Sequence, residues 1–167
     1  MLPVLILLIG IFSRIVYHTP NFTPILALAL FGGTYLKKKY ALSVPLALMI
    51  ISDLFIGLHD VIFFTWGSVA LIAWMGLWLR KHKSVYGVAG CSVAAAFGFF
   101  LITNFGAWLV MYPLTLAGLK NCYLAAIPFY RQTFFSTFIY SIVLFGSYEL
   151  SAVFIRKTRY ADLLLAS

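Results

Sequence analysis

The sequence predicts an all-α protein, a polytopic bundle of about six transmembrane helices that forms a single domain over residues 1–167. Apolar residues make up 63% of the chain, charged residues only 10%, and the mean hydropathy is +1.02. A soluble domain is roughly 45–50% apolar and about 25% charged. A soluble fold of this length could not cover so many apolar side chains, because its outside must face water. Lipid as the surrounding solvent removes the difficulty.

Six apolar runs give the expected helices in chain order. The first covers residues 2–17. The second, residues 22–36, is short and contains Gly32 and Gly33, so we expect it to be tilted, broken or shielded by its neighbours. The remaining four reach the length of about 17–25 residues that a bilayer requires; they are residues 41–58, 61–79, 85–111 and 133–155.

The stretch before the last run is also apolar. Residues 113–128 contain few polar side chains, which predicts an interfacial or re-entrant helix that covers the outer mouth of the bundle. Trp108, Tyr112, Tyr123 and Tyr130 lie near this boundary, as an aromatic belt does.

The cationic residues predict the orientation. Nine of the 12 Lys and Arg residues lie in three linkers that alternate with linkers holding only Lys120 and Arg131. Cytoplasmic linkers carry the excess of positive charge. We therefore expect a multi-pass protein of the bacterial cell (inner) membrane, with both termini in the cytoplasm. The three clusters are Lys37, Lys38 and Lys39; Arg80, Lys81 and Lys83; and Arg156, Lys157 and Arg159.

Several functional classes are disfavoured. The net charge of +8 comes from these linker clusters and not from a patch on a folded domain, so no nucleic-acid partner is expected. The chain contains no phosphate-binding glycine loop, no His-Glu-x-x-His and no nucleophile elbow. Cys91 and Cys122 lack metal-ligand spacing. We expect no enzymatic activity, no catalytic residues, no cofactor and no bound metal.

Ionisable residues within apolar runs indicate function, since each costs about 2.5–3.5 kcal/mol on insertion scales. Asp53 lies six residues before His59, hence roughly 9 Å below the outer end of its helix. Arg14 lies four residues before His18, on the same helix face. Glu149 lies near the cytoplasmic end, where we expect a partner among the inner cations.

A polar and aromatic stripe on the fifth run lies at about the same depth in the membrane as Asp53 and Arg14. Asn104, Trp108 and Tyr112 are spaced i, i+4, i+8. These positions predict an outward-facing pocket for a small flat ligand. The alternative is that Asp53 pairs with Arg14 or Arg131 only to hold helices together. The predicted pocket residues are Arg14, His18, Asn21, Asp53, His59, Asn104, Trp108, Tyr112 and Arg131.

Small residues recur at four-residue spacing in two places, Ala29 with Gly33 and the series Gly90, Ala94, Gly98. This spacing lets helix backbones approach closely. It predicts either packing within the bundle or the docking of a partner membrane subunit.

Several blocks of the chain form recognisable motifs. The first block runs from His18-Thr19-Pro20-Asn21-Phe22-Thr23-Pro24 to Ala27-Leu28-Ala29-Leu30-Phe31-Gly32-Gly33. Others are Ser52-Asp53-Leu54 with Gly57-Leu58-His59, Thr103-Asn104-Phe105-Gly106 with Trp108, and Met111-Tyr112-Pro113. Together these blocks resemble an uncharacterised bacterial family of small membrane transport proteins.

That family is distantly similar to the substrate-binding subunits of energy-coupling-factor vitamin transporters. The similarity implies a six-helix fold, an outward substrate pocket, and partners consisting of a transmembrane scaffold subunit with two ATPases. Those subunits commonly dock through an alanine-x-x-x-alanine pattern on the first helix, and residues 1–14 contain none. The nearest equivalent is Ala29 with Gly33 on the second run.

Two functional hypotheses follow. The first is a membrane-embedded subunit that captures a small polar or aromatic nutrient for uptake, with the lipid bilayer and the substrate as partners and residues 113–128 as a lid. It predicts that Asp53→Ala abolishes binding and spares folding. The second is a non-catalytic membrane anchor or accessory subunit of a redox or assembly complex, in which His18 and His59 could ligate a haem.

Overall fold

The computed structural model describes residues 1–16 and 21–165, and every regular element among them is helical. Four segments are long and apolar enough to cross a membrane: Lys38–Ile56, Ile62–Leu79, Val85–Met111 and Leu116–Ile155. In chain order the elements are α1 (Leu2–Val16), α2 (Ile25–Tyr35), the 3-10 turn η1 (Lys38–Tyr40), α3 (Ser43–Ile56), α4 (Ile62–Leu79), α5 (Val85–Met111), α6 (Leu116–Ile155) and α7 (Ala161–Leu164).

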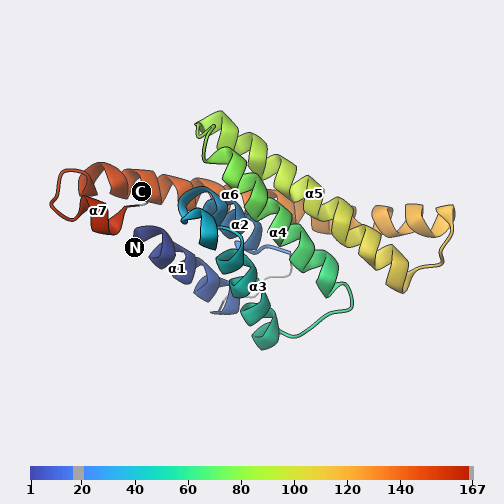
Figure 1. The fold of residues 1–167 in the computed structure, drawn as a ribbon. Helices are drawn as coiled ribbons and strands as arrows, with labels where there is room; N and C mark the ends of the chain where they lie inside the picture. Colours follow the sequence, from blue (N-terminus) through green and yellow to red (C-terminus); the bar gives the residue numbers. More distant parts are fainter. Residues whose placement is uncertain (17–20, 166–167) are drawn as a thin grey trace.

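Helix α2 forms the centre of the molecule. All eleven of its residues are buried, and it packs against α1, α3, α4, α5 and α6 (Figure 1). Its sequence alternates leucine and alanine without a polar face, which is the composition of a helix shielded on all sides. At about 16 Å it is too short to span a bilayer. The expectation that neighbours shield the second apolar run is confirmed.

Helices α2 and α4 touch backbone to backbone at two glycines. A Cβ atom on Gly33 would lie 2.0 Å from the carbonyl oxygen of Ala73 and 2.8 Å from the Cα of Gly76. A Cβ on Gly76 would meet the carbonyl oxygen of Leu30 at 2.4 Å. Gly33 therefore serves packing within the bundle, one of the two predicted uses of small residues.

The other small-residue series has a different environment. A Cβ on Gly90 or Gly98 would meet nothing within 4 Å, and Ala94 is exposed. This face of α5 makes no close helix contact, whereas Cys91 and Ala95 on the opposite face of the same turns are buried.

Arg80 closes the carboxyl end of α2. Its guanidinium donates from Nε to the carbonyl of Thr34 (3.0 Å) and from Nη2 to those of Gly33 (3.0 Å) and Leu36. The last carbonyls of a helix have no partner in the helix and carry the negative end of its dipole. A cation there stabilises the buried end of α2 and ties it to the end of α4.

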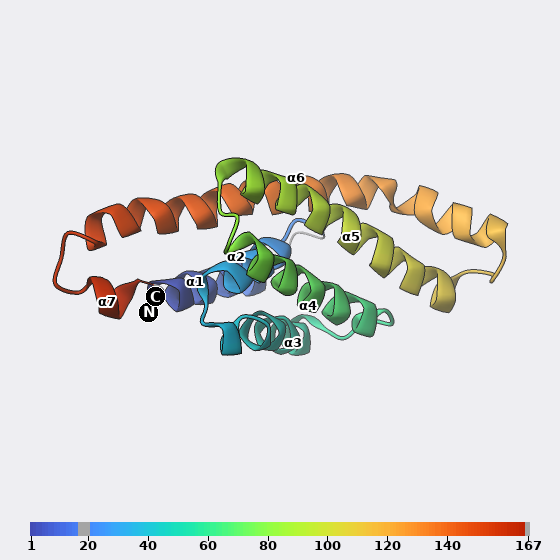
Figure 2. The ribbon, with the colours of Figure 1, turned by 45° about the horizontal axis from the view of Figure 1, so that its top comes forward.

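The long hairpin of α5 and α6 corrects the predicted interfacial or re-entrant segment. Residues 116–155 form one continuous 40-residue helix, with Pro128 inside it. At roughly 60 Å it is about twice as long as a bilayer core is thick. Its first part lies along α5, where the Tyr123 hydroxyl donates to the carbonyl of Leu101 (2.7 Å), and the linked ends project beyond α1–α4 (Figure 2).

The two described ends of the chain meet at one end of the molecule. The amino group of Met1 donates to the carbonyls of Leu163 (3.3 Å) and Leu164 (3.1 Å) in α7. Figure 1 shows the N and C labels close together. The contact is compatible with the predicted topology, which places both ends on one side of the membrane.

Candidate functional site

A buried ion pair joins α1 to α3. Arg14 Nη2 donates to Asp53 Oδ1 at 2.8 Å, and the two residues are only 8% and 2% exposed. The other carboxylate oxygen, Oδ2, accepts from Trp66 Nε1 of α4 at 2.9 Å, and Arg14 Nη1 donates to the Ser52 hydroxyl. One carboxylate thus holds together groups from three helices, and the charges compensate each other where burial would otherwise penalise both.

One donor of this cluster is unused. Arg14 Nε is buried and has no hydrogen-bond partner among the described residues. An unsatisfied buried donor costs about 1–3 kcal/mol, more when the group is charged. Arg14 also lines a cavity, so a ligand group in that cavity could supply the missing acceptor.

This cavity, called the polar cavity below, has a volume of about 380 Å³. A second cavity of about 180 Å³ adjoins it, and the two share Asn21, Phe99, Thr103, Asn104 and Thr133. The volume lies in the range of about 300–1,000 Å³ that is usual for small-molecule sites. Helices α1–α6 and the links at residues 21–23 and 57–61 all contribute to its lining, which consists of Arg14, Asn21, Thr23, Ile25, Leu26, Met49, His59, Val61, Thr65, Phe99, Thr103, Asn104, Ala107, Thr133 and Ser136.

The polar groups of the wall act mainly as acceptors. Thr103 and Thr133 donate their hydroxyl hydrogens to the carbonyls of Phe99 (2.8 Å) and Phe129 (3.1 Å), one turn earlier in their own helices. The Asn104 amide likewise donates to the carbonyl of Phe100 at 2.7 Å. A hydroxyl that donates to its own helix keeps oxygen lone pairs for other partners. The wall therefore suits a ligand that brings hydrogen-bond donors, and Arg14 Nε suits an acceptor on it.

The structure brings together part of the predicted pocket. Arg14, Asn21, His59 and Asn104 line the polar cavity, and Asp53 lies behind Arg14. His18 lies outside the described residues.

The aromatic part of the predicted pocket lies elsewhere. Trp108 Nε1 donates to the carbonyl of Pro113 at 3.0 Å, and its ring packs against Phe105. Tyr112 is half-buried at the end of α5, and Arg131 is exposed on α6. None of the three lines the polar cavity or the cavity adjoining it. The aromatic side chain in the wall of the polar cavity is Phe99.

Ser52, Trp66 and the threonines of the wall were not predicted. The sequence contained a feature that could have identified Trp66. The short link at residues 57–61 makes α3 and α4 antiparallel neighbours. Asp53 lies three residues before the end of α3 and Trp66 four residues after the start of α4, so the hairpin places them side by side.

Glu149 has the partner that was predicted for it. Its Oε1 lies 2.5 Å from Lys83 Nζ and accepts a hydrogen bond from the Tyr35 hydroxyl. This pair lies at the end of the bundle where α2 stops and α5 starts, away from the polar cavity.

The geometry defines a class of protein: an all-helical bundle with four helices long enough to cross a membrane and a polar cavity at its centre. Large apolar side chains such as Phe12, Phe63 and Phe154 cover its outside, which is compatible with lipid as the surrounding solvent. No group of three or more His, Cys, Asp or Glu side chains that could hold a metal ion occurs among residues 1–16 and 21–165.

The chain belongs to the family described as "Family of unknown function (DUF6580)", whose model matches residues 1–161. Comparison with the curated proteins and with the solved structures gives no match.

Proposed function

We propose that this protein is a non-enzymatic membrane subunit that captures a small polar nutrient, possessing flat or aromatic parts, for uptake. The observation that carries the proposal is the polar cavity, with the free Nε donor of Arg14 in its wall. An unsatisfied buried donor beside a cavity of ligand size is expected where a ligand completes the hydrogen bonding.

The charges of the site favour a ligand without net charge. The positive charge of Arg14 is compensated by Asp53 at 2.8 Å. An ionic ligand would bring an uncompensated charge into a low-dielectric site, which is unfavourable. The supported ligand carries an acceptor such as a carbonyl for Arg14 Nε, donors for the threonine oxygens, and a flat apolar part that packs against Phe99.

The resemblance to substrate-binding subunits of energy-coupling-factor transporters supports the same proposal. It adds a transmembrane scaffold subunit with two ATPases as partners. Because no nucleotide-binding loop occurs in the chain, the energy for transport would have to come from such partners. In this proposal the three cationic clusters and both termini face the cytoplasm.

The test is native mass spectrometry of the protein purified gently from its own membranes. We expect a bound non-lipid molecule on the wild-type protein. The variant Asn104→Leu replaces a polar side chain in the wall of the polar cavity by an apolar one and leaves the Arg14–Asp53 pair intact. It should lose that molecule. Arg131→Gln, which changes an exposed residue outside the cavity, is the control and should retain it.

Two results would contradict the proposal. One is a wild-type protein that carries only lipid under conditions in which it remains folded. The other is a bound molecule that Asn104→Leu and Arg131→Gln retain equally. A haem or a redox subunit in the wild-type preparation would favour the accessory-subunit function instead.

A further inference from the structure

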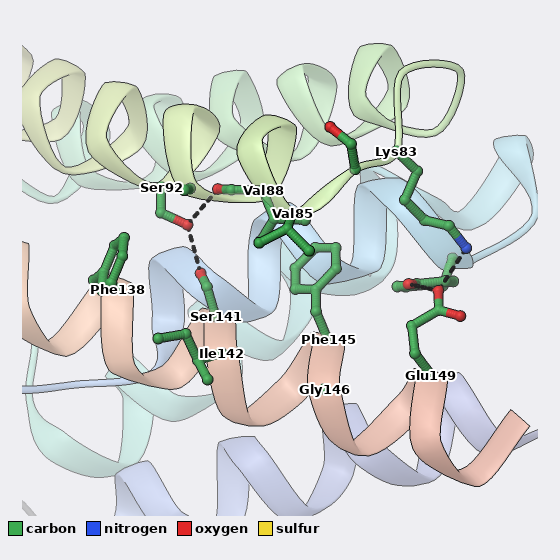
Figure 3. A pocket seen from close by; sticks show the side chains of 13 residues that line it. Lys83, Val85, Val88, Ser92, Phe138, Ser141, Ile142, Phe145, Gly146 and Glu149 are labelled. Carbon is green, nitrogen blue, oxygen red and sulfur yellow. Dashed lines mark hydrogen bonds and ion pairs between the residues drawn. The ribbon is translucent and has the colours of Figure 1, made fainter. Parts of the chain in front are cut away.

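A third cavity lies between α5 and α6, toward the end of the bundle where α2 stops and α5 starts. This apolar groove has a volume of about 470 Å³, and Figure 3 shows its lining on the facing sides of the two helices. Val85, Val88, Phe138, Ile142 and Phe145 form its walls. Val85 is 83% exposed and Ile142 is 60% exposed, so the groove is open on its side.

One end of the groove is charged. Lys83 and Glu149 form an ion pair there, with Nζ and Oε1 2.5 Å apart, and both side chains are about two-fifths exposed. Ser84 caps the start of α5 at the same end by accepting from the Gly87 amide at 2.9 Å. The first amides of a helix carry the positive end of its dipole, so this end presents a positive group on α5 beside a negative group on α6.

The length of the groove matches one half of a bilayer. Phe138 and Glu149 are eleven residues apart on α6, a distance of about 16 Å. Half of a hydrocarbon core is about 15 Å. When the Lys83–Glu149 pair is placed at the membrane surface, the apolar groove extends from there to the centre of the bilayer.

The shape of the groove suits a slim apolar occupant. It is a slot about 16 Å long between two helices, with apolar walls and one open side. An acyl chain is unbranched and apolar, so it can lie along such a slot.

From these observations we infer that the apolar groove binds one acyl chain of an inner-leaflet phospholipid whose headgroup is phosphatidylethanolamine. The phosphate lies at Lys83 and the start of α5, and the primary ammonium lies at Glu149. The headgroup carries one charge of each sign, as the ion pair does. Phosphatidylglycerol offers no cation to Glu149, and the quaternary ammonium of phosphatidylcholine has no N–H to donate.

The experiment reconstitutes the full chain with equal amounts of phosphatidylethanolamine, phosphatidylglycerol and phosphatidylcholine, and measures retained lipid by native mass spectrometry. We expect phosphatidylethanolamine to be retained about tenfold over either competitor, the factor that one charge-assisted hydrogen bond supplies. Glu149→Gln should remove most of this preference and leave one retained lipid, because the acyl chain still fits the groove.

A matched pair of variants tests the position. Ile142→Trp fills the groove and should lose the retained lipid. Ile139→Trp places the same side chain on an exposed part of α6 outside the groove and should keep it. Thermal unfolding of both variants shows that they remain folded.

The inference is wrong if both tryptophan variants retain lipid equally, or if phosphatidylglycerol or phosphatidylcholine is preferred by the wild-type protein. It is also wrong if Ile142→Trp releases a protein subunit instead of a lipid. Since Asn104 and the polar cavity are not involved, these results are independent of those that test nutrient capture.

Discussion

Asp53 accepts hydrogen bonds through both carboxylate oxygens, from Arg14 on one side and Trp66 on the other. This arrangement alters what a substitution at Asp53 would measure. Removal of the carboxylate leaves the Arg14 guanidinium buried without its counter-charge, whether or not a ligand is present. A defect in binding would then be difficult to separate from a defect in folding.

We therefore expect Asp53→Ala to destabilise the bundle by about 3–5 kcal/mol, the usual effect of removing one partner of a buried ion pair. Thermal unfolding of the purified protein in detergent measures it. Asp60→Ala removes an exposed carboxylate and serves as the control, with little expected change. Equal unfolding temperatures for the two variants would show that the pair contributes nothing to stability.

The sequence was sufficient to predict Arg14, Asp53 and Asn104 as interior positions, because charged and amide groups in apolar runs must be shielded from lipid. It was not sufficient for Trp108 and Tyr112. Helical spacing shows that these residues share a stripe, but it does not show which part of the stripe the other helices cover. In α5 the Asn104 turn faces the cavity, whereas Trp108 turns toward Pro113.

At the level of elements, the crossing of α2 and α4 depends on the absence of side chains at Gly33 and Gly76. We expect Gly33→Ala or Gly76→Ala to force the helices apart and to lower stability by at least about 1–3 kcal/mol, the range for overpacked cores. Chemical or thermal unfolding in detergent provides the measurement.

Gly98→Ala is the matched control for this crossing, since a Cβ there meets nothing within 4 Å. Alanine favours a helix over glycine, so this variant should be neutral or slightly more stable. A loss at Gly98 as large as at Gly33 would contradict the close helix contact as the cause, because a Cβ at Gly98 meets nothing within 4 Å.

Helix α6 offers a second test at this scale. Spin labels at exposed positions 124 and 150 should lie about 39 Å apart along a continuous helix. The labels are introduced as Leu124→Cys and Leu150→Cys after Cys91 and Cys122 have been replaced by alanine. The pulsed dipolar distance distribution checks the value.

A control pair at positions 135 and 150 should give about 22 Å, because residues 133–155 are helical in either arrangement. A re-entrant segment before residue 128 would shorten the first distance and leave the second unchanged. The sequence favoured a separate interfacial or re-entrant segment here because residues 113–128 are apolar and contain few polar side chains. In the structure α6 is continuous and lies beside α5. The sequence did predict the length of α5, residues 85–111.

For the whole molecule, the central question is its orientation in the membrane. Arg80 at the end of α2, the Lys83–Glu149 pair and the contact of Met1 with α7 all connect segments that positive-charge counting assigns to the cytoplasm. Counting could predict which linkers share a side. It could predict that the second apolar run is short, but not that five other helices would surround α2, since an apolar run does not reveal its neighbours.

We expect a green fluorescent reporter fused to either end of the chain to fluoresce, and alkaline phosphatase fused there to be inactive, because the predicted topology places both ends in the cytoplasm. A fusion within the link at residues 57–61 should give the opposite pattern. Activity of phosphatase at only one end would mean an odd number of membrane crossings and would contradict the topology.

The complete burial of α2 also has a consequence for biosynthesis. Insertion machinery releases segments into lipid in the order in which they are made, yet α2 is too short to span on its own and acquires its closest neighbour only when α4 has been synthesised. We therefore expect α2 to remain incompletely packed until residues 62–79 have been synthesised. Assembly of this protein is expected to proceed around α4 and to draw the earlier helix into place afterwards.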